Sequence, residues 1–257
     1  MKVVILCGGK GTRLKEETEF KPKPMVLIGG KPILWHIMKI YSAQGFNDFI
    51  LCLGYKGDII KNYFLNYQHF IDDFTLHLDL ATGQKEVHQG NVSTESFRIT
   101  FVNTGEDTQT GERLKMVGRY IGGEDFMVTY GDGVADVNLS RLVEFHRSMG
   151  AMGTITCTHP HSKYGLVTVN DNALIGAFEQ KPRLFDYING GFMVFKKEFL
   201  DVLQPGHALE DVFPSLIQNG QMAGYRHEGF WHCMDTHKDM EDLNKIWSET
   251  PYWKLWT

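Results

Sequence analysis

The sequence predicts an α/β fold in which helices flank a mixed, mostly parallel β-sheet. Segments rich in β-branched and aromatic residues alternate along the chain with amphipathic segments of helical length. This alternation is typical of parallel strands joined by helices. The chain has 257 residues, of which 42% are hydrophobic and 22% charged. That composition supplies enough apolar side chains for one large core and argues against disorder.

The first predicted elements are a buried strand, a glycine-rich loop and an amphipathic helix. Residues 2–7 form a continuous apolar run, as expected of a central strand covered on both faces. The loop that follows begins at Gly8. Pro32 is suited to the start of a helix, and apolar residues then recur at helical spacing until Gly45.

The same order continues to about residue 150. We predict strands over 49–53, 98–103 and 126–130, and helices over 59–65, 112–121 and 139–149. Between about 66 and 96 the order breaks, because Phe74, Leu76, Leu78 and Leu80 alternate with polar residues. This alternation predicts an inserted ribbon with two different faces.

The second half of the chain is rich in predicted strands. They span 154–158, 166–169, 173–179, 191–195 and 230–234, and a helix spans 238–247. Asn170-Asp171-Asn172 is a predicted turn between two of these strands. We therefore divide the chain into a core over 1–150 and a smaller portion over 151–257. Because no flexible linker separates them, we expect one compact body.

The net charge argues against two classes of partner, and the cysteine spacing argues against disulfides and zinc sites. The formal net charge is −5 and the sequence pI is about 6.1, so neither a nucleic acid nor an anionic membrane is an expected partner. The four cysteines are far apart without a CxxC pair, which favours reduced thiols over disulfides or zinc sites. The apolar stretch near the N-terminus is too short for a signal peptide or a membrane span, and we predict a cytoplasmic protein.

The loop after the first strand is the first candidate binding site. It reads Gly8-Gly9-Lys10-Gly11-Thr12-Arg13, and glycines there let backbone N–H groups approach phosphate closely. It lacks the third glycine of the dinucleotide-binding motif and the Gly-Lys-Ser/Thr ending of a Walker loop. A nicotinamide dehydrogenase would also carry an acidic residue at the end of the second strand. The sequence there is Gly54-Tyr55-Lys56, which argues against that class.

Two cationic residues accompany the loop. Arg13 lies within it, and Lys23 stands between Pro22 and Pro24. The prolines restrict the backbone, so Lys23 is presented from a stiff segment. A rigidly held ammonium and a forked guanidinium are suited to neutralise a polyphosphate during group transfer.

These motifs resemble the signature of the sugar-1-phosphate nucleotidylyltransferases. The resemblance covers nearly the whole chain and rests on Gly8 to Leu14, Lys21-Pro22-Lys23-Pro24-Met25, Tyr130-Gly131-Asp132-Gly133, Tyr164-Gly165, Gln180-Lys181-Pro182, Asn189-Gly190-Gly191 and Met234-Asp235-Thr236. It implies a Rossmann-like core of the nucleotide-diphospho-sugar transferase type, with a strand-rich sugar-binding C-terminal portion. The implied reaction is attack by a sugar 1-phosphate on the α-phosphorus of a nucleoside triphosphate, with release of pyrophosphate.

The resemblance also implies the roles of individual residues. Arg13 and Lys23 would be catalytic, and Asp132 and Asp235 would together hold Mg²⁺, whose preference for carboxylate oxygens fits this pair. The implied nucleotide-binding residues are Leu6, Cys7, Gly8, Gly9, Lys10, Gly11, Thr12, Arg13, Lys23, Thr104, Gly111, Arg113 and Gly131. The implied sugar-phosphate-binding residues are Gly165, Glu179, Gln180, Lys181, Asn189 and Gly190.

One of these positions departs from the family pattern. The family usually has a glutamate immediately before the lysine, whereas this chain has Gln180 there and Glu179 one position earlier. Either side chain could accept the sugar hydroxyls, because a neutral amide also forms hydrogen bonds to hydroxyl groups.

The segment expected to contact the base resembles the cytidylyl branch of the family. Thymidylyl and uridylyl relatives carry a glutamine and a Gly-x-x-x-Ala helix start there, where this chain has Val102-Asn103-Thr104-Gly105 and Thr110-Gly111-Glu112-Arg113. Cytosine needs donors for O2 and N3 and an acceptor for its amino group. Arg113, the Thr104 hydroxyl and backbone near Gly111 could supply the donors.

The predicted partners are therefore CTP and α-D-glucose 1-phosphate, giving CDP-glucose and pyrophosphate. The family implies that CDP-glucose feeds dideoxysugar synthesis for bacterial surface polysaccharides such as the O-antigen of lipopolysaccharide. The alternatives are the same reaction with UTP or dTTP, and a non-catalytic nucleotide-sugar sensor. A sensor would be expected to lack Lys23, Arg13 or one of the two aspartates, and all four residues are present.

The C-terminus is unusually aromatic. Trp247, Trp253 and Trp256 are three of the five tryptophans of the chain. This much apolar area would not remain in water, so the tail either folds back on its own chain or packs on another subunit. Members of the family are commonly oligomers, and we expect a homo-oligomer here.

Overall fold

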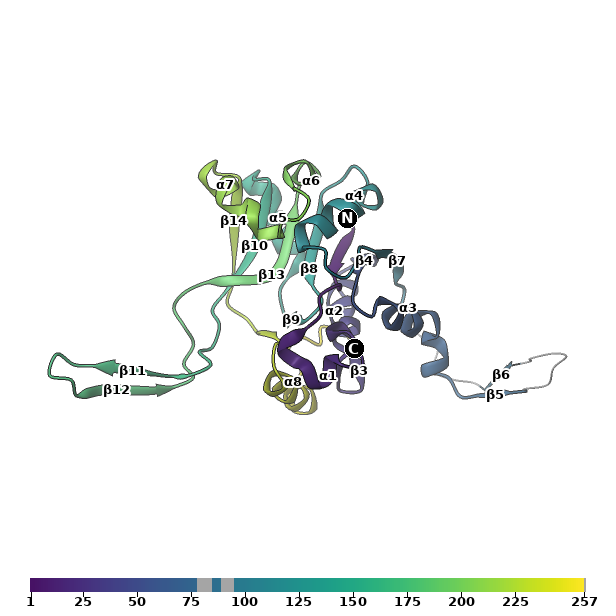
Figure 1. Cartoon of the computed structure of the whole chain (residues 1–257), viewed down its shortest axis with the longest axis horizontal. Helices are drawn as coiled ribbons and strands as arrows, with labels where there is room; N and C mark the ends of the chain where they lie inside the picture. Colours follow the sequence, from purple (N-terminus) through teal and green to yellow (C-terminus); the bar gives the residue numbers. More distant parts are fainter. Residues whose placement is uncertain (78–84, 89–94, 257) are drawn as a thin grey trace.

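A seven-stranded β-sheet with helices on both faces forms the centre of the molecule, and two β-ribbons project from it in opposite directions (Figure 1). This computed structural model describes residues 1–77, 85–88 and 95–256. The predicted α/β class with a mixed, mostly parallel sheet is confirmed.

The strand order places β1 in the middle of the sheet. That order is β14-β10-β13-β8-β1-β4-β7. The strands are β1 (Val3–Leu6), β4 (Asp48–Leu53), β7 (Arg98–Asn103), β8 (Phe126–Tyr130), β10 (Gly153–Thr158), β13 (Ile188–Phe195) and β14 (Met222–His227). Only β13 runs antiparallel to its neighbours, β10 and β8. All four residues of β1 are buried, as expected for its apolar sequence. The sheet takes strands from both sides of residue 150, where we expected the first portion to end.

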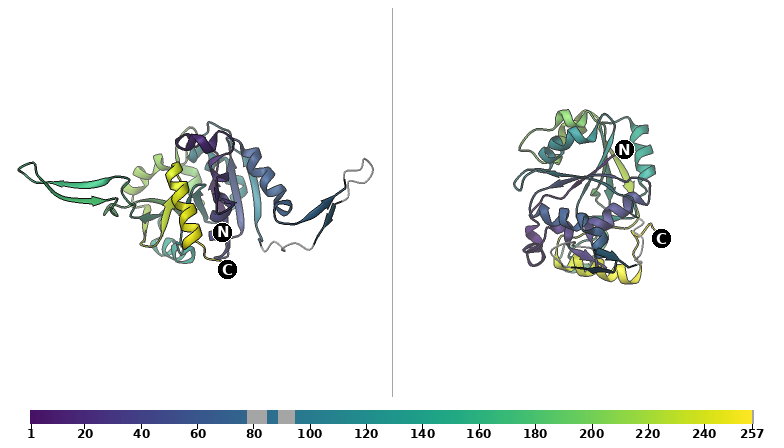
Figure 2. Two further views of the ribbon diagram at one scale, coloured as in Figure 1. Left: turned by 90° about the horizontal axis from the view of Figure 1, so that it is seen from below. Right: turned by 90° about the vertical axis from the view of Figure 1, so that its right-hand side faces the viewer.

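The helices cover two apolar faces of the sheet, which are best seen end-on in the right panel of Figure 2. One face is covered by α2 (Ile33–Ser42), α3 (Gly57–Leu65) and α5 (Leu139–Met149), and by α8 (His237–Glu249) at its margin. The other is covered by α4 (Thr110–Ile121), α6 (Phe199–Val202) and α7 (Phe213–Gln218). The short elements α1 (Lys15–Thr18), η1 (Thr12–Leu14), η2 (Lys23–Met25), η3 (Tyr67–Phe70) and η4 (Leu209–Val212) lie in connections. Within the described ranges, no helix has the length and apolar content needed to cross a membrane.

Short strand pairs complete the structure. The two ribbons are β5–β6 (Phe74–Leu76 and Lys85–Val87), within the predicted insertion, and β11–β12 (Gly165–Val169 and Ile175–Gln180). Leu78 and Leu80 of the predicted alternation lie outside the described residues. Two further pairs lie against the body: β2–β3 (Leu27–Ile28 and Lys31–Pro32) and β9–β15 (Gly133–Ala135 and Trp231–Cys233). The predicted turn at Asn170 joins β11 to β12. The N–H of Asn170 donates to Leu174 O at 2.8 Å.

The aromatic C-terminus folds back onto its own chain. Trp253 is fully buried, and Trp247 and Trp256 pack against the same core. Gly29 makes this close packing possible. Its φ is +56°, and a Cβ there would lie 2.0 Å from the Nε1 atom of Trp247. Of the two alternatives for the tail, the structure shows the fold-back.

A buried histidine lies at the centre of this tryptophan cluster. His36 Nε2 donates to Ile28 O at 2.8 Å, and His36 Nδ1 accepts from Trp253 Nε1 at 3.3 Å. Both ring nitrogens are thus engaged in a way that only the neutral imidazole allows. Burial lowers the pKa of His36 from 6.5 to about 4, so protonation would break the contact with the tail.

We expect the stability of the fold to decrease in acid because of His36. The unfolded chain takes up a proton near pH 6.5 while folded His36 stays neutral until about pH 4. This residue therefore contributes stability that is fully present above pH 6.5 and is lost as the pH falls toward 4, by up to about 3 kcal/mol. Urea unfolding of the wild type and of His36→Asn at several pH values measures the difference. Equal pH dependence of the two proteins between pH 4 and 6.5 would contradict the assignment.

Candidate functional site

A cavity of about 430 Å³ opens at the carboxyl end of β1, where α/β folds bind ligands. Predicted site residues that line it are Leu6, Cys7, Gly8, Gly9, Lys10, Gly11, Arg13, Lys23, Arg113, Gly131 and Asp132. Thr104 is buried, and its hydroxyl oxygen accepts a hydrogen bond from Arg113. Gly111 lies in the first turn of α4, where a Cβ would come within 2.9 Å of His207 O. Thr12 opens η1, next to the lining residues.

The glycine-rich loop needs two of its glycines for close packing. A Cβ on Gly8 would lie 2.0 Å from a guanidinium nitrogen of Arg113. Gly11 has φ +63°, and a Cβ there would lie 3.1 Å from the Cβ of Lys23. Because neither position has room for a side chain, the loop can pack closely against Arg113 of α4 and against Lys23.

Lys23 is held where its sequence context predicted, on a restricted segment. Pro22 is extended with φ −69°, and η2 begins at Lys23. The lysine side chain is only 10% exposed, and its Nζ atom lies 2.7 Å from Asp132 Oδ2 and 2.8 Å from Asp235 Oδ1. One ammonium group therefore joins two carboxylates that are 103 residues apart in the sequence (235 − 132).

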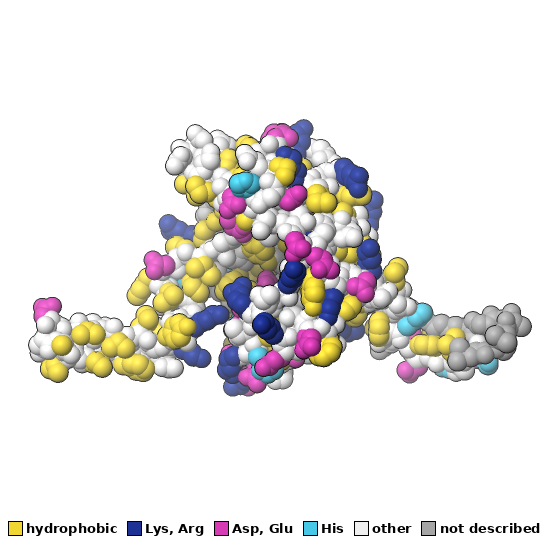
Figure 3. All heavy atoms as spheres, in the orientation of Figure 1, with side chains coloured by type: hydrophobic (Ala, Val, Ile, Leu, Met, Phe, Trp, Pro, Cys, Tyr) yellow, Lys and Arg dark blue, Asp and Glu magenta, His cyan; other side chains and the backbone are white. Residues whose placement is uncertain are grey.

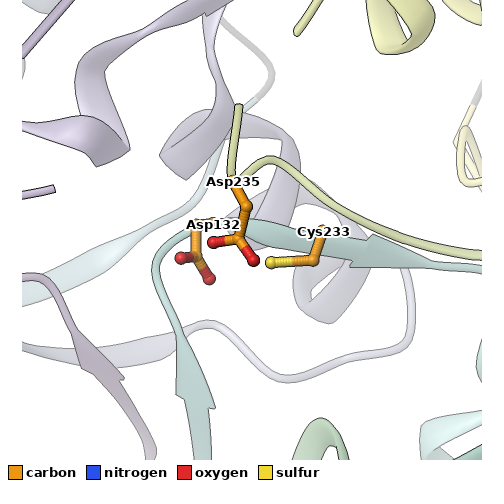
Figure 4. Close-up of side chains that lie close together, drawn as sticks. All are labelled: Asp132, Cys233 and Asp235. Atoms are coloured by element: carbon orange, nitrogen blue, oxygen red, sulfur yellow. The ribbon is translucent and has the colours of Figure 1, made fainter. Parts of the chain in front are cut away.

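The antiparallel β9–β15 pair brings the two aspartates together. Asp132 immediately precedes β9, and Asp235 follows β15 by two residues. Gly133 pairs with Cys233, and the N–H of Met234 donates to Asp132 O at 2.9 Å. The carboxylates consequently lie side by side in Figure 4. The sequence placed both residues after strands, but their proximity depends on this pairing of distant segments.

Electrostatic interactions favour the charged forms of Lys23 and Asp235. Burial lowers the pKa of Lys23, but the charge of Asp132 and the hydrogen bonds to both aspartates outweigh it and leave that pKa raised. Burial likewise raises the pKa of Asp235, and the hydrogen bond and charge of Lys23 outweigh it, so that pKa is lowered. Arg13 adds a second cation, with Nη1 2.9 Å from Asp235 Oδ2. Two basic side chains thus lie against the two aspartates.

The donor set suits a divalent cation. Two carboxylates at one point offer the hard oxygen ligands that Mg²⁺ prefers, and Mg²⁺ keeps further positions for water and phosphate. The ammonium of Lys23 already takes the place of a cation between them, at hydrogen-bond distance from each. Asp132 and Asp235 thus form a donor pair that fits a divalent metal ion.

Arg113 is buried, and its guanidinium joins two loops. Its Nη1 donates to Gly105 O at 2.6 Å and to Thr104 Oγ1 at 2.7 Å. Its Nη2 donates to Glu106 O at 3.0 Å and to Gly8 O at 3.2 Å. The side chain thereby ties the glycine-rich loop to the loop between β7 and α4, and both loops line the cavity.

A second cavity, of about 730 Å³, is lined by Asp235 and not by Asp132. It is lined by Lys181 and Asp235 together with residues of the β15–α8 segment. Lys181 has φ +50°, an uncommon conformation for a residue with a side chain, at the base of the β11–β12 ribbon. The other residues predicted to contact the sugar divide into two groups: Gly165, Glu179 and Gln180 on that ribbon, and Asn189 and Gly190 on β13.

The structure contains a hydrogen-bond network around Glu210 that the sequence does not predict. The hydroxyl of Tyr130 donates to the carboxylate of Glu210, in η4, and Thr110 Oγ1 donates to the same carboxylate at 3.5 Å. Glu210 thus links the start of α4 to the end of β8, and both of its partners line the first cavity. No motif marks Glu210, because its relation to Tyr130 arises only when η4 packs against α4.

Comparison with known proteins agrees with this arrangement. A protein of Bacillus subtilis named a probable glucose-1-phosphate cytidylyltransferase is 44% identical over 260 residues, covering all of both chains. The glucose-1-phosphate cytidylyltransferase of Salmonella typhimurium is 43% identical over 261 residues, again with full coverage of both. The crystal structure of HddC from Yersinia pseudotuberculosis superimposes with a TM-score of 0.70 at 24% identity, covering 96% of this chain and 99% of that one, and supports the fold. The family model described as Nucleotidyl transferase matches residues 2–250, and the chain belongs to that family.

Proposed function

We propose that this protein transfers the cytidylyl group of CTP to α-D-glucose 1-phosphate, giving CDP-glucose and pyrophosphate. The observation that carries the proposal is the position of the Lys23–Asp132–Asp235 cluster. Asp132 lines the cavity with the glycine-rich loop, Asp235 lines the cavity with Lys181, and Lys23 joins the two. A triphosphate in the first cavity and a sugar phosphate in the second would meet at this cluster. The full-length similarity to cytidylyltransferases supports the choice of substrates.

The protein's main contribution is charge stabilisation. The attacking phosphate is already ionised, so the reaction needs no general base. Mg²⁺ held by Asp132 and Asp235 would offset negative charge at the α-phosphate and favour in-line displacement. Lys23 and Arg13, released from the carboxylates, would neutralise the charge that develops on the pyrophosphate leaving group.

Base selection would depend on the shape of the loops that Arg113 joins. Its Nη1 and Nη2 groups already donate to Gly8, Thr104, Gly105 and Glu106, so we assign Arg113 a role in fixing the loops around the base. Backbone groups of the 106–110 segment, which lines the cavity, would then form hydrogen bonds with the edge of cytosine. Because buried groups left unpaired are costly, such a pocket would discriminate against uracil.

Lys181 would bind the sugar phosphate in the second cavity. Its charge faces the same cavity as Asp235, and its backbone is fixed by the ribbon that carries Glu179 and Gln180. Asn189 and Gly190 lie on the adjoining part of β13, where they would border the glucose ring. Because the substrates are a nucleoside triphosphate and a sugar phosphate, we place the reaction in the cytoplasm, as a step before synthesis of surface polysaccharide.

We also propose that the protein is a homo-oligomer. The register of β11–β12 puts Val167 opposite Phe178 and Val169 opposite Ile175, which gives the ribbon one apolar face. All four side chains are exposed, and yellow apolar surface extends along this ribbon in Figure 3. A two-stranded ribbon is only marginally stable alone in water, so a second copy covering this face would stabilise it.

The function is tested by pyrophosphate release with glucose 1-phosphate, Mg²⁺ and one of CTP, UTP, dTTP, ATP or GTP. We expect a strong preference for CTP, and loss of activity when a chelator removes the metal. Equal use of UTP would instead support the uridylyl alternative. Tight CDP-glucose binding without release from any triphosphate would support the sensor and overturn the proposal.

Replacement of Lys23 should lower turnover severely. In Lys23→Met, a neutral side chain of similar length leaves the two carboxylates and the leaving group without their cation, so we expect kcat to fall by at least about 10²-fold. Lys15→Met, on the exposed side of α1, is the matched control and should behave as wild type. Steady-state kinetics at saturating CTP and Mg²⁺ measure the effect. Wild-type turnover of Lys23→Met would exclude a catalytic role for this lysine.

Charge on the apolar face of the ribbon should disrupt the oligomer. We expect the double variant Val167→Glu, Phe178→Glu to dissociate, because burying carboxylates in an apolar interface is unfavourable. Thr168→Glu, on the opposite face of the same strand, is the control. Size-exclusion chromatography with light scattering measures the mass. A monomeric wild type, or a double variant of unchanged mass, would contradict the proposal.

A further inference from the structure

Cys233 places a sulfur atom beside the two aspartates. One ligand atom each from Asp132, Cys233 and Asp235 lie within 4.8 Å of one another. Figure 4 shows the Cys233 side chain extending toward the carboxylate of Asp235. The arrangement follows from the extended backbone at the end of β15, where residues two apart share a face. Met234, between them, points the other way and is fully buried in the core.

This cluster already surrounds a positive charge. The Nζ atom of Lys23 lies 2.7 Å and 2.8 Å from the two carboxylates, so a cation is accommodated there at short range. Zinc takes sulfur at about 2.3 Å and oxygen at about 2.0–2.2 Å in tetrahedral geometry. The three ligand atoms lie within 4.8 Å of one another, so a zinc ion would draw them closer together once Lys23 turned away.

The donor set differs from one made only of carboxylates. Mg²⁺ prefers oxygen and gains little from sulfur, whereas a thiolate strongly favours zinc and cadmium. We infer that Cys233 is a third protein ligand at this centre, and that the centre binds thiophilic divalent cations such as Zn²⁺ in competition with Mg²⁺. This inference rests on the proposed function, because it concerns the same metal site. It adds a ligand and a class of cation to that site.

The binding step balances without a redox partner. A metal–sulfur bond forms as the S–H bond breaks, and the proton passes to solvent. The bound ion would displace the Lys23 ammonium from both carboxylates. With three protein ligands the ion would be held without nucleotide, so Zn²⁺ would occupy the site before CTP and Mg²⁺ arrive. We therefore expect Zn²⁺ to inhibit Mg²⁺-dependent turnover, with inhibition relieved as Mg²⁺ is raised.

Cobalt provides a direct spectroscopic test. Co²⁺ is titrated into chelator-treated full-length protein without any substrate, and the sulfur-to-cobalt charge-transfer band in the near ultraviolet is recorded. We expect the band at one equivalent of metal in the wild type and in Cys157→Ser, whose thiol lies in β10 outside the cluster. Cys233→Ser should give no band. In competition with a chromophoric chelator, it should bind Zn²⁺ at least about 10-fold more weakly, because serine oxygen is a poor zinc ligand.

The outcomes separate this inference from the proposed function. Far-ultraviolet circular dichroism first establishes that each variant is folded. No band in folded wild-type protein, or an equal band in Cys233→Ser, would overturn the assignment of Cys233 even if CTP-dependent pyrophosphate release is intact. A band that depends on Cys233, in a protein that releases no pyrophosphate from any triphosphate, would support the metal ligand while the proposed function failed.

Discussion

The ion pairs of Lys23 with Asp132 and Asp235 are the contacts on which the site depends. They join segments from the beginning, middle and end of the chain, and Lys23 is nearly buried, so its charge requires partners. The same carboxylates are the hard ligands suited to a divalent metal. Lysine and metal would therefore compete for one position, and metal binding would free the lysine for the phosphates. In the structure the charge of Lys23 is neutralised by the two carboxylates that the proposed metal would occupy.

Hydrogen bonds within the protein fix the loops around this cluster before any ligand binds. Arg113 donates to carbonyl oxygens of both the glycine-rich loop and the 105–106 segment. Its buried guanidinium therefore has hydrogen-bond partners without a ligand. Glu210 connects Tyr130 to the start of α4. Such preorganisation reduces the ordering cost when substrates bind. Glu210, which no motif marks, thus contacts two residues that line the first cavity.

The projecting ribbons place apolar side chains where the core cannot cover them. The core covers the aromatic C-terminus: three tryptophans pack around neutral His36, and Gly29 leaves space for Trp247. The β11–β12 ribbon, in contrast, exposes apolar residues on one face and begins and ends beside predicted sugar-binding residues. If a second copy covers that face, assembly would also fix the ribbon from which Lys181 extends.

The sequence by itself determined the fold class, most strands and helices of the sheet, and the segments that carry the chemistry. Local signals suffice there: a continuous apolar strand, helical spacing after Pro32, and glycines and prolines around Lys23. It missed β14, because Met222–His227 has neither an apolar run nor regular alternation and is a strand only through its pairing with β10. Only the tertiary structure brought Asp132, Cys233 and Asp235 to one point. It also engaged the donors of Arg113 with backbone carbonyl oxygens and the Thr104 hydroxyl. Those contacts join residues distant in sequence, and their geometry is set by strand pairing and packing, which local patterns do not encode.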